Sequence, residues 1–340
     1  MSMTLFVTSI KNVVGRASIL AHNSPKLGGA FFAGVTIVIW VGFIIIARAS
    51  AQGVLTGLDI AALRILGASS VLLPTGFWIN KSRALTLPAR AMKGATSFWQ
   101  LSPLGLKLTL QMGLAGGLLY AVFSYSGFFF APAAHASVLL PGSLPLWTSL
   151  IAWMTLSQPI GWRRMIGLLL ILAGDLLVGG PSLFDMLSHP GVWRGDALFV
   201  LASISWSFYT VLVRQHGVQA VHATTAITVF SFFTFIPFYI LLCLLGWVPT
   251  HLLDAPLKTV AFQFFFQGVL SVVIAGITFN QMIRYFGPVR STMITAIVPG
   301  FSAVGASLIL GESMTPNIII GLAMVTIGIL FGVQRVFALK

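Results

Sequence analysis

The sequence predicts an all-α integral membrane protein whose ten transmembrane helices form two inverted five-helix repeats. The chain of 340 residues is 57% hydrophobic and only 7% charged, with a mean hydropathy of +0.99, which excludes an ordinary soluble domain. Its apolar runs are long and continuous, unlike the short alternating segments of a membrane β-barrel. Landmarks of the first half recur in the second half.

Ten apolar segments are long enough to cross a bilayer core of ~30 Å, which requires about 20 helical residues. The predicted helices cover residues 28–47, 58–79, 105–130, 133–156, 161–180, 195–213, 222–247, 259–285, 289–310 and 316–335. The predicted organisation is an N-terminal segment 1–27, a first repeat 28–180, an outer linker 181–194, a second repeat 195–335 and a tail 336–340.

The duplication is visible in the spacing of individual residues. Trp40 precedes Arg48 by eight residues, and Trp206 precedes Arg214 by the same distance. Four further residues recur 154 positions later, so that Pro145, Gln158, Gly167 and Gly174 correspond to Pro299, Glu312, Gly321 and Gly328. Because each copy has an odd number of spans, the second crosses the membrane in the opposite sense. Inverted repeats of this kind are the architecture of alternating-access transporters.

The net charge of +13 reflects topology and does not indicate a nucleic-acid partner. With the N-terminus in the cytoplasm, fifteen Lys and Arg residues fall on the cytoplasmic side and three on the far side, as the positive-inside rule requires. This predicts an inner (plasma) membrane protein of the bacterial type with both termini cytoplasmic. The basic cytoplasmic loop 81–104 has the composition for a short amphipathic helix. Segment 1–27 fits either an interfacial helix or a disordered tail.

The sequence contains no pattern for an enzyme, a metal or a cofactor. Cys243 is the single cysteine, which excludes an intrachain disulfide and a cysteine cluster. The H-E-x-x-H, G-x-S-x-G and Walker motifs are missing. Because the chain also lacks an ATPase domain, we expect any transport to be facilitated or driven by an ion gradient.

Several strings resemble the EamA domain of the drug/metabolite transporter superfamily, over roughly residues 28–335. They are GVTIVIWVGFIIIAR and AALRILGASSVLL in the first half, and GDALFVLASISWSFYTVLVR and IVPGFSAVGASLILGESMTPNIIIGLAMVTIGIL in the second. The resemblance implies a ten-helix carrier with a central cavity between inverted repeats, moving small metabolites such as amino acids, often outward. The sequence departs from the family at Gln158, where an acid is usual, and at Asp175, where an aliphatic residue is usual.

A transport site needs polar and aromatic groups where helices face a cavity, since a polar group that faces lipid loses its hydration. Span six has Ser203, Ser207 and Thr210 at helical spacing, with an aromatic residue on the same side. This stripe suits either a cavity wall or a helix–helix interface. Across the whole chain, the predicted cavity residues are Trp40, Tyr120, Ser203, Trp206, Tyr209, Asn280 and Gln281.

Arg64, Pro145 and Pro299 are candidates for gating or hinge roles. Arg64 lies in the second span, where it can attract an anionic substrate group, form a gate with an outer acid such as Asp59, or snorkel to the headgroups. Each proline removes a backbone hydrogen bond and kinks its helix. The kink either exposes carbonyls to a cavity or only curves the helix.

Asp175 is the one acid well inside a span, which suggests a proton carrier or a structural acid nearer the surface. His135 is similarly either a pH sensor or a passive interfacial residue. The small-residue pair Gly328 and Gly332 predicts close helix contact, within the chain or in a homodimer.

Together these features predict a secondary transporter, an exporter of a small organic metabolite such as an amino acid or related compound. The expected partners are the lipid bilayer and the solute, together with a proton as coupling ion if Asp175 carries protons, and a second copy of the chain if the small-residue face forms a homodimer. A non-transporting membrane sensor or assembly partner, or a channel, remains as an alternative.

Overall fold

The computed structural model describes residues 25–86, 94–184 and 191–333, so most of the predicted N-terminal segment and the whole predicted tail 336–340 lie outside the described residues. Helices dominate this part of the chain, and the only β-type pairing within it is an isolated bridge between Ser97 and Ser102. Eight helices there are long and apolar enough to cross a membrane, and a shorter apolar helix covers Pro316–Phe331. The all-α membrane fold is confirmed, while the count of ten spans stays a prediction.

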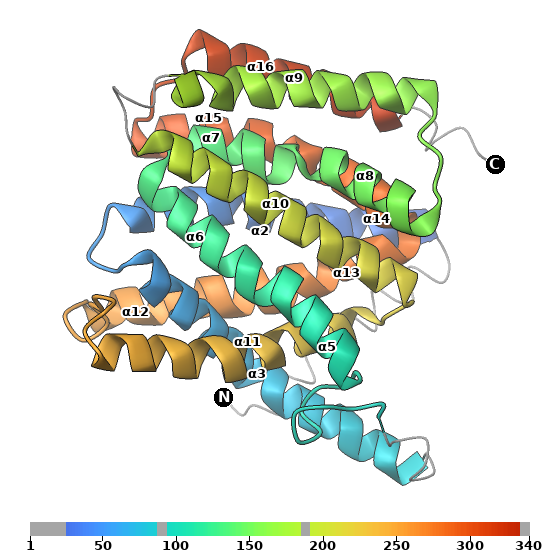
Figure 1. The fold of residues 1–340 in the computed structure, drawn as a ribbon, viewed down its shortest axis with the longest axis vertical. Coiled ribbons are helices and arrows are strands. Elements are labelled where there is room, and N and C mark those ends of the chain that lie inside the picture. Colours follow the sequence, from blue (N-terminus) through green and yellow to red (C-terminus); the bar gives the residue numbers. More distant parts are fainter. Residues whose placement is uncertain (1–24, 87–93, 185–190, 334–340) are drawn as a thin grey trace.

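The first half consists of two continuous helices, two interrupted ones and a final helix. Their bounds are α2 Pro25–Ala51, α3 Gly57–Thr86, α5 Leu106–Met112, η1 Gly113–Leu119, α6 Tyr120–Phe130, α7 Ala133–Ser137, η2 Val138–Gly142, α8 Leu144–Leu156 and α9 Trp162–Phe184. The second half repeats this order. Its bounds are α10 Val192–Gln215, α11 Ala220–Leu244, α12 Leu257–Gln263, η3 Phe264–Ile274, α13 Ala275–Phe286, α14 Pro288–Ile294, η4 Thr295–Ile297, α15 Val298–Leu310 and α16 Pro316–Val333. In Figure 1, α10 of the second half runs between α6 and the α7–α8 helix of the first half.

Corresponding helices of the two halves are interrupted at corresponding places. The η1 and η3 segments are wide π-helical turns, and η2 and η4 interrupt the next helix of each half. Pro145 and Pro299 lie in the first turn of the helices that resume after η2 and η4. A proline is tolerated there because the first turn of a helix leaves its N–H groups without intrahelical partners. Both hinge candidates therefore mark a discontinuity in the same helix of each half.

The two halves pack on each other reciprocally. The first helix of each half contacts the third and fourth helices of the other half, which are the interrupted ones. Thus α2 lies against α13 and α15, and α10 lies against α6 and α8. In the same way α3 packs on η3, and α11 packs on η1. The α9 and α16 helices pair along one edge of the molecule, at the top of Figure 1.

Glycines allow the closest of these helix contacts. A Cβ atom on Gly67 of α3 would lie 2.1 Å from the backbone oxygen of Phe264, so α3 and η3 can approach only because that position lacks a side chain. A Cβ atom on Gly328 would lie 2.5 Å from the backbone oxygen of Gly167 in the same chain. The small-residue face at Gly328 is thus used in the contact between α9 and α16.

Some boundaries differ from those expected. The α9 helix ends at Phe184 and α10 begins at Val192, so both extend into the predicted linker 181–194. The α3 helix continues to Thr86, into the predicted loop 81–104. The described remainder of that loop forms a tight turn closed by backbone hydrogen bonds between Ser97 and Ser102, and the short amphipathic helix that its composition allows is not formed there. Packing decides the difference, because Phe98 stacks on Phe233 of α11 with ring centroids 5.7 Å apart.

Candidate functional site

Five aromatic rings from both halves meet at the centre of the molecule. Trp206 of α10 lies 4.6 Å from Tyr120, 5.0 Å from Tyr209, 5.8 Å from Phe279 and 6.1 Å from Trp40, measured between ring centroids. Trp40 in turn lies 4.9 Å from Phe279 of α13. We call these five residues the aromatic cluster. It joins four of the predicted cavity residues, contributed by α2, α6 and α10.

The aromatic cluster closes the centre of the protein. Trp206 is only 5% exposed, and it separates two small cavities of about 20 and 10 Å³. The first of these volumes suffices for about one water molecule. Any larger solute therefore requires Trp206 and its neighbours to move apart.

Buried polar groups adjoin the cluster. The Asn280 side-chain amide donates hydrogen bonds to the Tyr209 hydroxyl at 2.6 Å and to Thr224 Oγ1 at 3.1 Å. Its own carbonyl oxygen is buried without a hydrogen-bond partner, as is the indole N–H of Trp206. Burying such groups unpaired is unfavourable, so the centre has hydrogen-bonding capacity that the described side chains leave unused.

Arg64 lies inside the protein next to the cluster. It is 7% exposed, and its guanidinium donates a hydrogen bond to the Tyr125 hydroxyl at 3.3 Å. The guanidinium carbon lies 5.7 Å from the ring centroids of Phe43 and Tyr120 and 5.8 Å from that of Tyr125. This burial does not fit a side chain that snorkels to the headgroups.

A gate between Arg64 and Asp59 is not formed in this structure. Asp59 accepts hydrogen bonds from the Tyr239 hydroxyl, from Thr250 Oγ1 at 2.8 Å and from the backbone N–H of His251 at 3.1 Å. These contacts tie the start of α3 to the loop that follows α11. Arg64 has no ion pair within the described part of the chain, so its charge is left without a carboxylate.

Three other candidates lie apart from the cluster. The Ser203 hydroxyl accepts a hydrogen bond from Ser143 at 2.8 Å, which places it in the contact of α10 with the fourth helix of the first half. Gln281 accepts a bond of 3.4 Å from Arg284. Asp175 lies on the edge helix α9, is 8% exposed and makes no hydrogen bond to a described residue. Of the two interpretations of the Ser203 stripe, the helix–helix interface therefore accounts for the contact that Ser203 makes.

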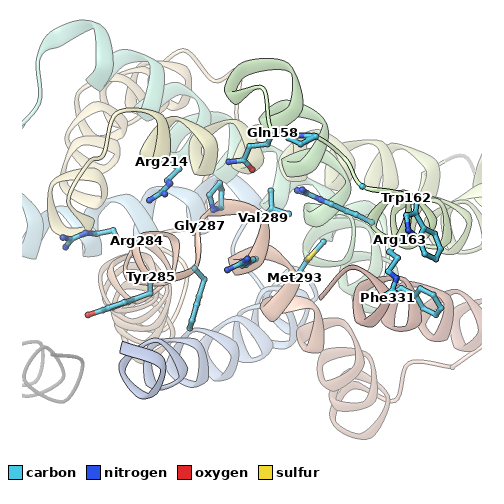
Figure 2. Close-up of a pocket in the computed structure, with 16 residues that line it drawn as sticks. Gln158, Trp162, Arg163, Arg214, Arg284, Tyr285, Gly287, Val289, Met293 and Phe331 are labelled. Carbon is cyan, nitrogen blue, oxygen red and sulfur yellow. The ribbon is translucent and has the colours of Figure 1, made fainter. Parts of the chain in front are cut away.

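A pocket of about 580 Å³ opens at one end of the molecule (Figure 2). Arg214 and Arg284 lie on one side of it and Trp162 and Arg163 on the other. Five arginines and no acidic residue line this pocket, which we call the arginine pocket. The arginines are Arg163, Arg164, Arg214, Arg284 and Arg290.

The opposite end is closed by charged contacts. Arg48 at the end of α2 forms an ion pair of 2.8 Å with Glu312, and it donates a second hydrogen bond to the backbone oxygen of Phe128. Glu312 also accepts hydrogen bonds from the backbone N–H groups of Ala133 and Ala134, in the first turn of α7. This arrangement ties four separate parts of the chain together.

The residues that correspond to this ion pair in the repeat line the open pocket. Arg214 is equivalent to Arg48, and Gln158 is equivalent to Glu312. Both lie at the arginine pocket, and Arg214 has no ion pair with a described residue. The same pair of positions is therefore joined at one end and separate at the other, where an amide replaces the carboxylate.

Sequence reasoning missed one member of the aromatic cluster, Phe279. Phe279 is apolar, so only its position next to Asn280 pointed to it. Arg64 was a candidate from the sequence, but its place beside the aromatic rings of Phe43, Tyr120 and Tyr125 was not foreseen. The rotation of a helix about its axis depends on its neighbours, which the sequence does not specify.

Comparisons with known proteins agree with this architecture. The uncharacterized transporter YyaM of Bacillus subtilis is 23% identical over 216 residues, 62% of this chain and 68% of that protein. An uncharacterized transporter of Archaeoglobus fulgidus is 24% identical over 278 residues, 82% of this chain and 88% of that protein. One crystal structure aligns with a TM-score of 0.56 at 19% identity, covering 92% of this chain and 99% of the other, which supports the fold alone.

The fold and these relatives define the class of protein: the chain is a membrane transporter. Residues 193–333, nearly all of the second half, match the EamA-like transporter family. The resemblance to EamA transporters of the drug/metabolite type is confirmed.

Proposed function

We propose that this protein is a secondary transporter that exports a small organic metabolite by alternating access. The observation that carries the proposal is the inequality of the two ends: equivalent residues form an ion pair at one end and line an open pocket at the other. The aromatic cluster lies between these ends and blocks a continuous path. A protein open to one side and blocked in the centre has the geometry expected of one state of a carrier.

The distribution of charge supports the orientation. The arginine pocket lies at the end where the sequence places the cytoplasmic Lys and Arg residues. The closed end carries Asp59, Asp196 and Glu312, with Asp196 paired to His135 at 2.9 Å. We therefore assign the open pocket to the cytoplasm of a bacterial-type inner membrane, with both termini on that side.

In the proposed cycle the two ends exchange states. The solute enters the arginine pocket, whose volume lies in the usual range for binding small molecules. Separation of the rings around Trp206 joins the two small central cavities into one site. Approach of Arg214 to Gln158 then closes the inner end while Arg48 and Glu312 separate. We propose export because the open pocket, where the solute is loaded, faces the cytoplasm.

Coupling to protons rests on Asp175 alone. It is buried and unpaired within the described residues, as a proton carrier requires, but it lies on α9, outside the aromatic cluster. An uncoupled exchanger remains the simpler proposal.

Flux in proteoliposomes tests the function. Vesicles containing the purified protein would be loaded with a pooled metabolite mixture, and efflux would be read by mass spectrometry with and without a pH gradient. Saturable efflux that is stimulated by solute on the opposite side would establish a carrier. Flux that rises linearly with concentration would indicate a channel, and binding without flux would indicate a sensor or assembly partner.

A further inference from the structure

The central cavity beside Trp206 is lined by hydrogen-bond donors that lack acceptors. Arg64, Ser271 and Trp206 all border the cavity of about 20 Å³. The Ser271 hydroxyl and the Trp206 indole N–H are buried without hydrogen-bond partners, and so is the side-chain nitrogen of Gln267, one turn before Ser271 on η3. Unpaired buried donors in one place indicate a ligand that accepts hydrogen bonds.

The direction of the hydrogen bonds follows from Arg64. An arginine side chain only donates, so the Tyr125 hydroxyl accepts from Arg64 and gives its single proton to the Gln267 carbonyl oxygen, at 2.7 Å. This fixes the orientation of the Gln267 amide and leaves its NH₂ group as the free end. The chain Arg64–Tyr125–Gln267 thus ends in a donor, and no described side chain supplies the acceptor.

The charge of this region points to an anion. A guanidinium stays protonated in proteins, and Arg64 is buried without an ion pair to any described residue. The rings of Phe43, Tyr120 and Tyr125 compensate for part of this charge but offer no bidentate partner. A carboxylate matches the planar guanidinium and would take up the neighbouring donors as well.

The surroundings also restrict the rest of the ligand. No aspartate or glutamate lines either small cavity or the arginine pocket, so a ligand ammonium group would find no anionic partner along the way. The aromatic cluster offers apolar ring faces to the body of the solute. The five arginines at the entrance raise the local concentration of anions and repel cations.

We propose that the cavity between Arg64, Ser271 and Trp206 binds the carboxylate of an organic acid that has an apolar or aromatic body and lacks an amino group. This inference rests on the proposed transport function, whose solute it narrows from amino acids and related compounds to organic acids. The Arg64 guanidinium binds the two carboxylate oxygens with two parallel hydrogen bonds. Gln267, Ser271 and Trp206 donate to the remaining lone pairs of those oxygens.

Three matched series of probes test the proposal on the purified full-length protein. Each series holds the body constant and varies one group: 3-phenylpropanoate, 3-phenylpropanamide and phenylalanine; hexanoate, hexanamide and norleucine; indole-3-propanoate, its amide and tryptophan. Binding is measured by thermal shift in all three series, and in the phenyl and hexanoyl series also by quenching of intrinsic tryptophan fluorescence. We expect at least one acid to bind about tenfold more tightly than both its amide and its amino acid, which corresponds to about 1.4 kcal/mol.

Variants assign the preference to the site. Arg64→Gln should abolish the preference for the acid over its amide, and Ser271→Ala should reduce it. The matched control is Arg194→Gln, which removes a charge at the start of α10, outside the site. If Arg64→Gln does not fold, the wild-type comparison and Ser271→Ala still decide the question. Equal binding of acid, amide and amino acid in all three series would overturn the proposal.

The same probes in proteoliposomes separate this inference from the proposed function. An acid that binds selectively but shows no flux would support the carboxylate site and contradict transport. Saturable flux of amines or amino acids without any preference for acids would support transport and contradict the carboxylate site.

Discussion

Trp40 and Trp206, which occupy equivalent positions in the two halves of the chain, meet edge to face with ring centroids 6.1 Å apart and planes at 75°. Two copies of one sequence position can meet only near the axis that relates the copies. The site therefore lies where the duplication itself brings the two halves together, and the equivalent arginines Arg48 and Arg214 lie at opposite ends of the molecule.

Trp206→Ala should impair both stability and transport. It removes a buried ring that contacts four other rings of the cluster, and truncation of a buried tryptophan costs about 3–5 kcal/mol. We expect a lower melting temperature and a raised KM for flux, both largely restored by Trp206→Phe. Trp153→Ala is the control, since Trp153 is 52% exposed on α8. Equal effects of the two alanine variants on KM would contradict a central role for Trp206.

Asn280→Ala should leave the Tyr209 hydroxyl and Thr224 without their shared donor. The loss of a buried hydrogen-bond partner costs about 1–3 kcal/mol, so we expect a measurable fall in melting temperature. Because Asn280 borders the cluster, the apparent affinity for the solute should fall as well. If Trp206→Ala and Asn280→Ala both leave flux and apparent affinity unchanged, the assignment of the site is wrong.

Ser203→Ala should affect stability alone. Its hydroxyl bonds to Ser143 between two helices, and one such hydrogen bond contributes about 0.5–1.5 kcal/mol. We expect KM to equal that of the wild type in the flux assay, with a small fall in melting temperature. A clear rise in KM would return Ser203 to the substrate-binding residues predicted from sequence.

Gln158→Glu should favour closure of the arginine pocket, because it supplies Arg214 with the carboxylate that Glu312 gives to Arg48. In a Cys243→Ser background, a Val289→Cys reporter in the pocket should react more slowly with a soluble thiol reagent. Gln158→Leu is the matched control, which alters the same position without adding a charge. The effect should vanish in the double variant Gln158→Glu, Arg214→Gln; slowing that persists there would contradict the gate.

Asp175→Asn should raise the melting temperature, because it replaces a buried carboxyl group that lacks a partner among the described residues. We expect solute exchange and its response to a pH gradient to stay as in the wild type. Asp175→Leu should have the same effects as Asp175→Asn on the melting temperature and on solute exchange. Loss of the pH response with exchange intact would identify Asp175 as the proton carrier.

The fold could be predicted from the sequence because hydrophobic length and charge asymmetry are set by the bilayer, independently of how the helices meet. The aromatic cluster followed in part from the duplication, since Trp40 and Trp206 had to lie in equivalent places. Which other side chains reach the centre depends on the rotation of each helix about its axis. Ser203 faces a neighbouring helix and Arg64 faces the centre, and one residue of difference in register would exchange such environments.

The tight turn between Ser97 and Ser102 shows that prediction from the sequence is limited for local structure as well. The basic composition of the loop was compatible with a short helix, whereas contacts of Phe98 and Trp99 with Phe233 hold a compact turn in the described part. Contacts between residues more than a hundred positions apart in the chain decide such cases, and a local pattern does not contain them.

The reciprocal packing has a consequence for biosynthesis. The α2 and α3 helices are made first, yet many of their partners, namely α11, α13, α15 and η3, emerge from the ribosome only much later. Until then the faces of α2 and α3 that contact these helices have no partner from the second half, whereas Arg64 can already contact Phe43, Tyr120 and Tyr125, which belong to the first half. A chain that stops after the first half therefore lacks the surfaces that complete its own core, and we expect the two halves to fold as one unit when synthesised together or co-expressed as fragments.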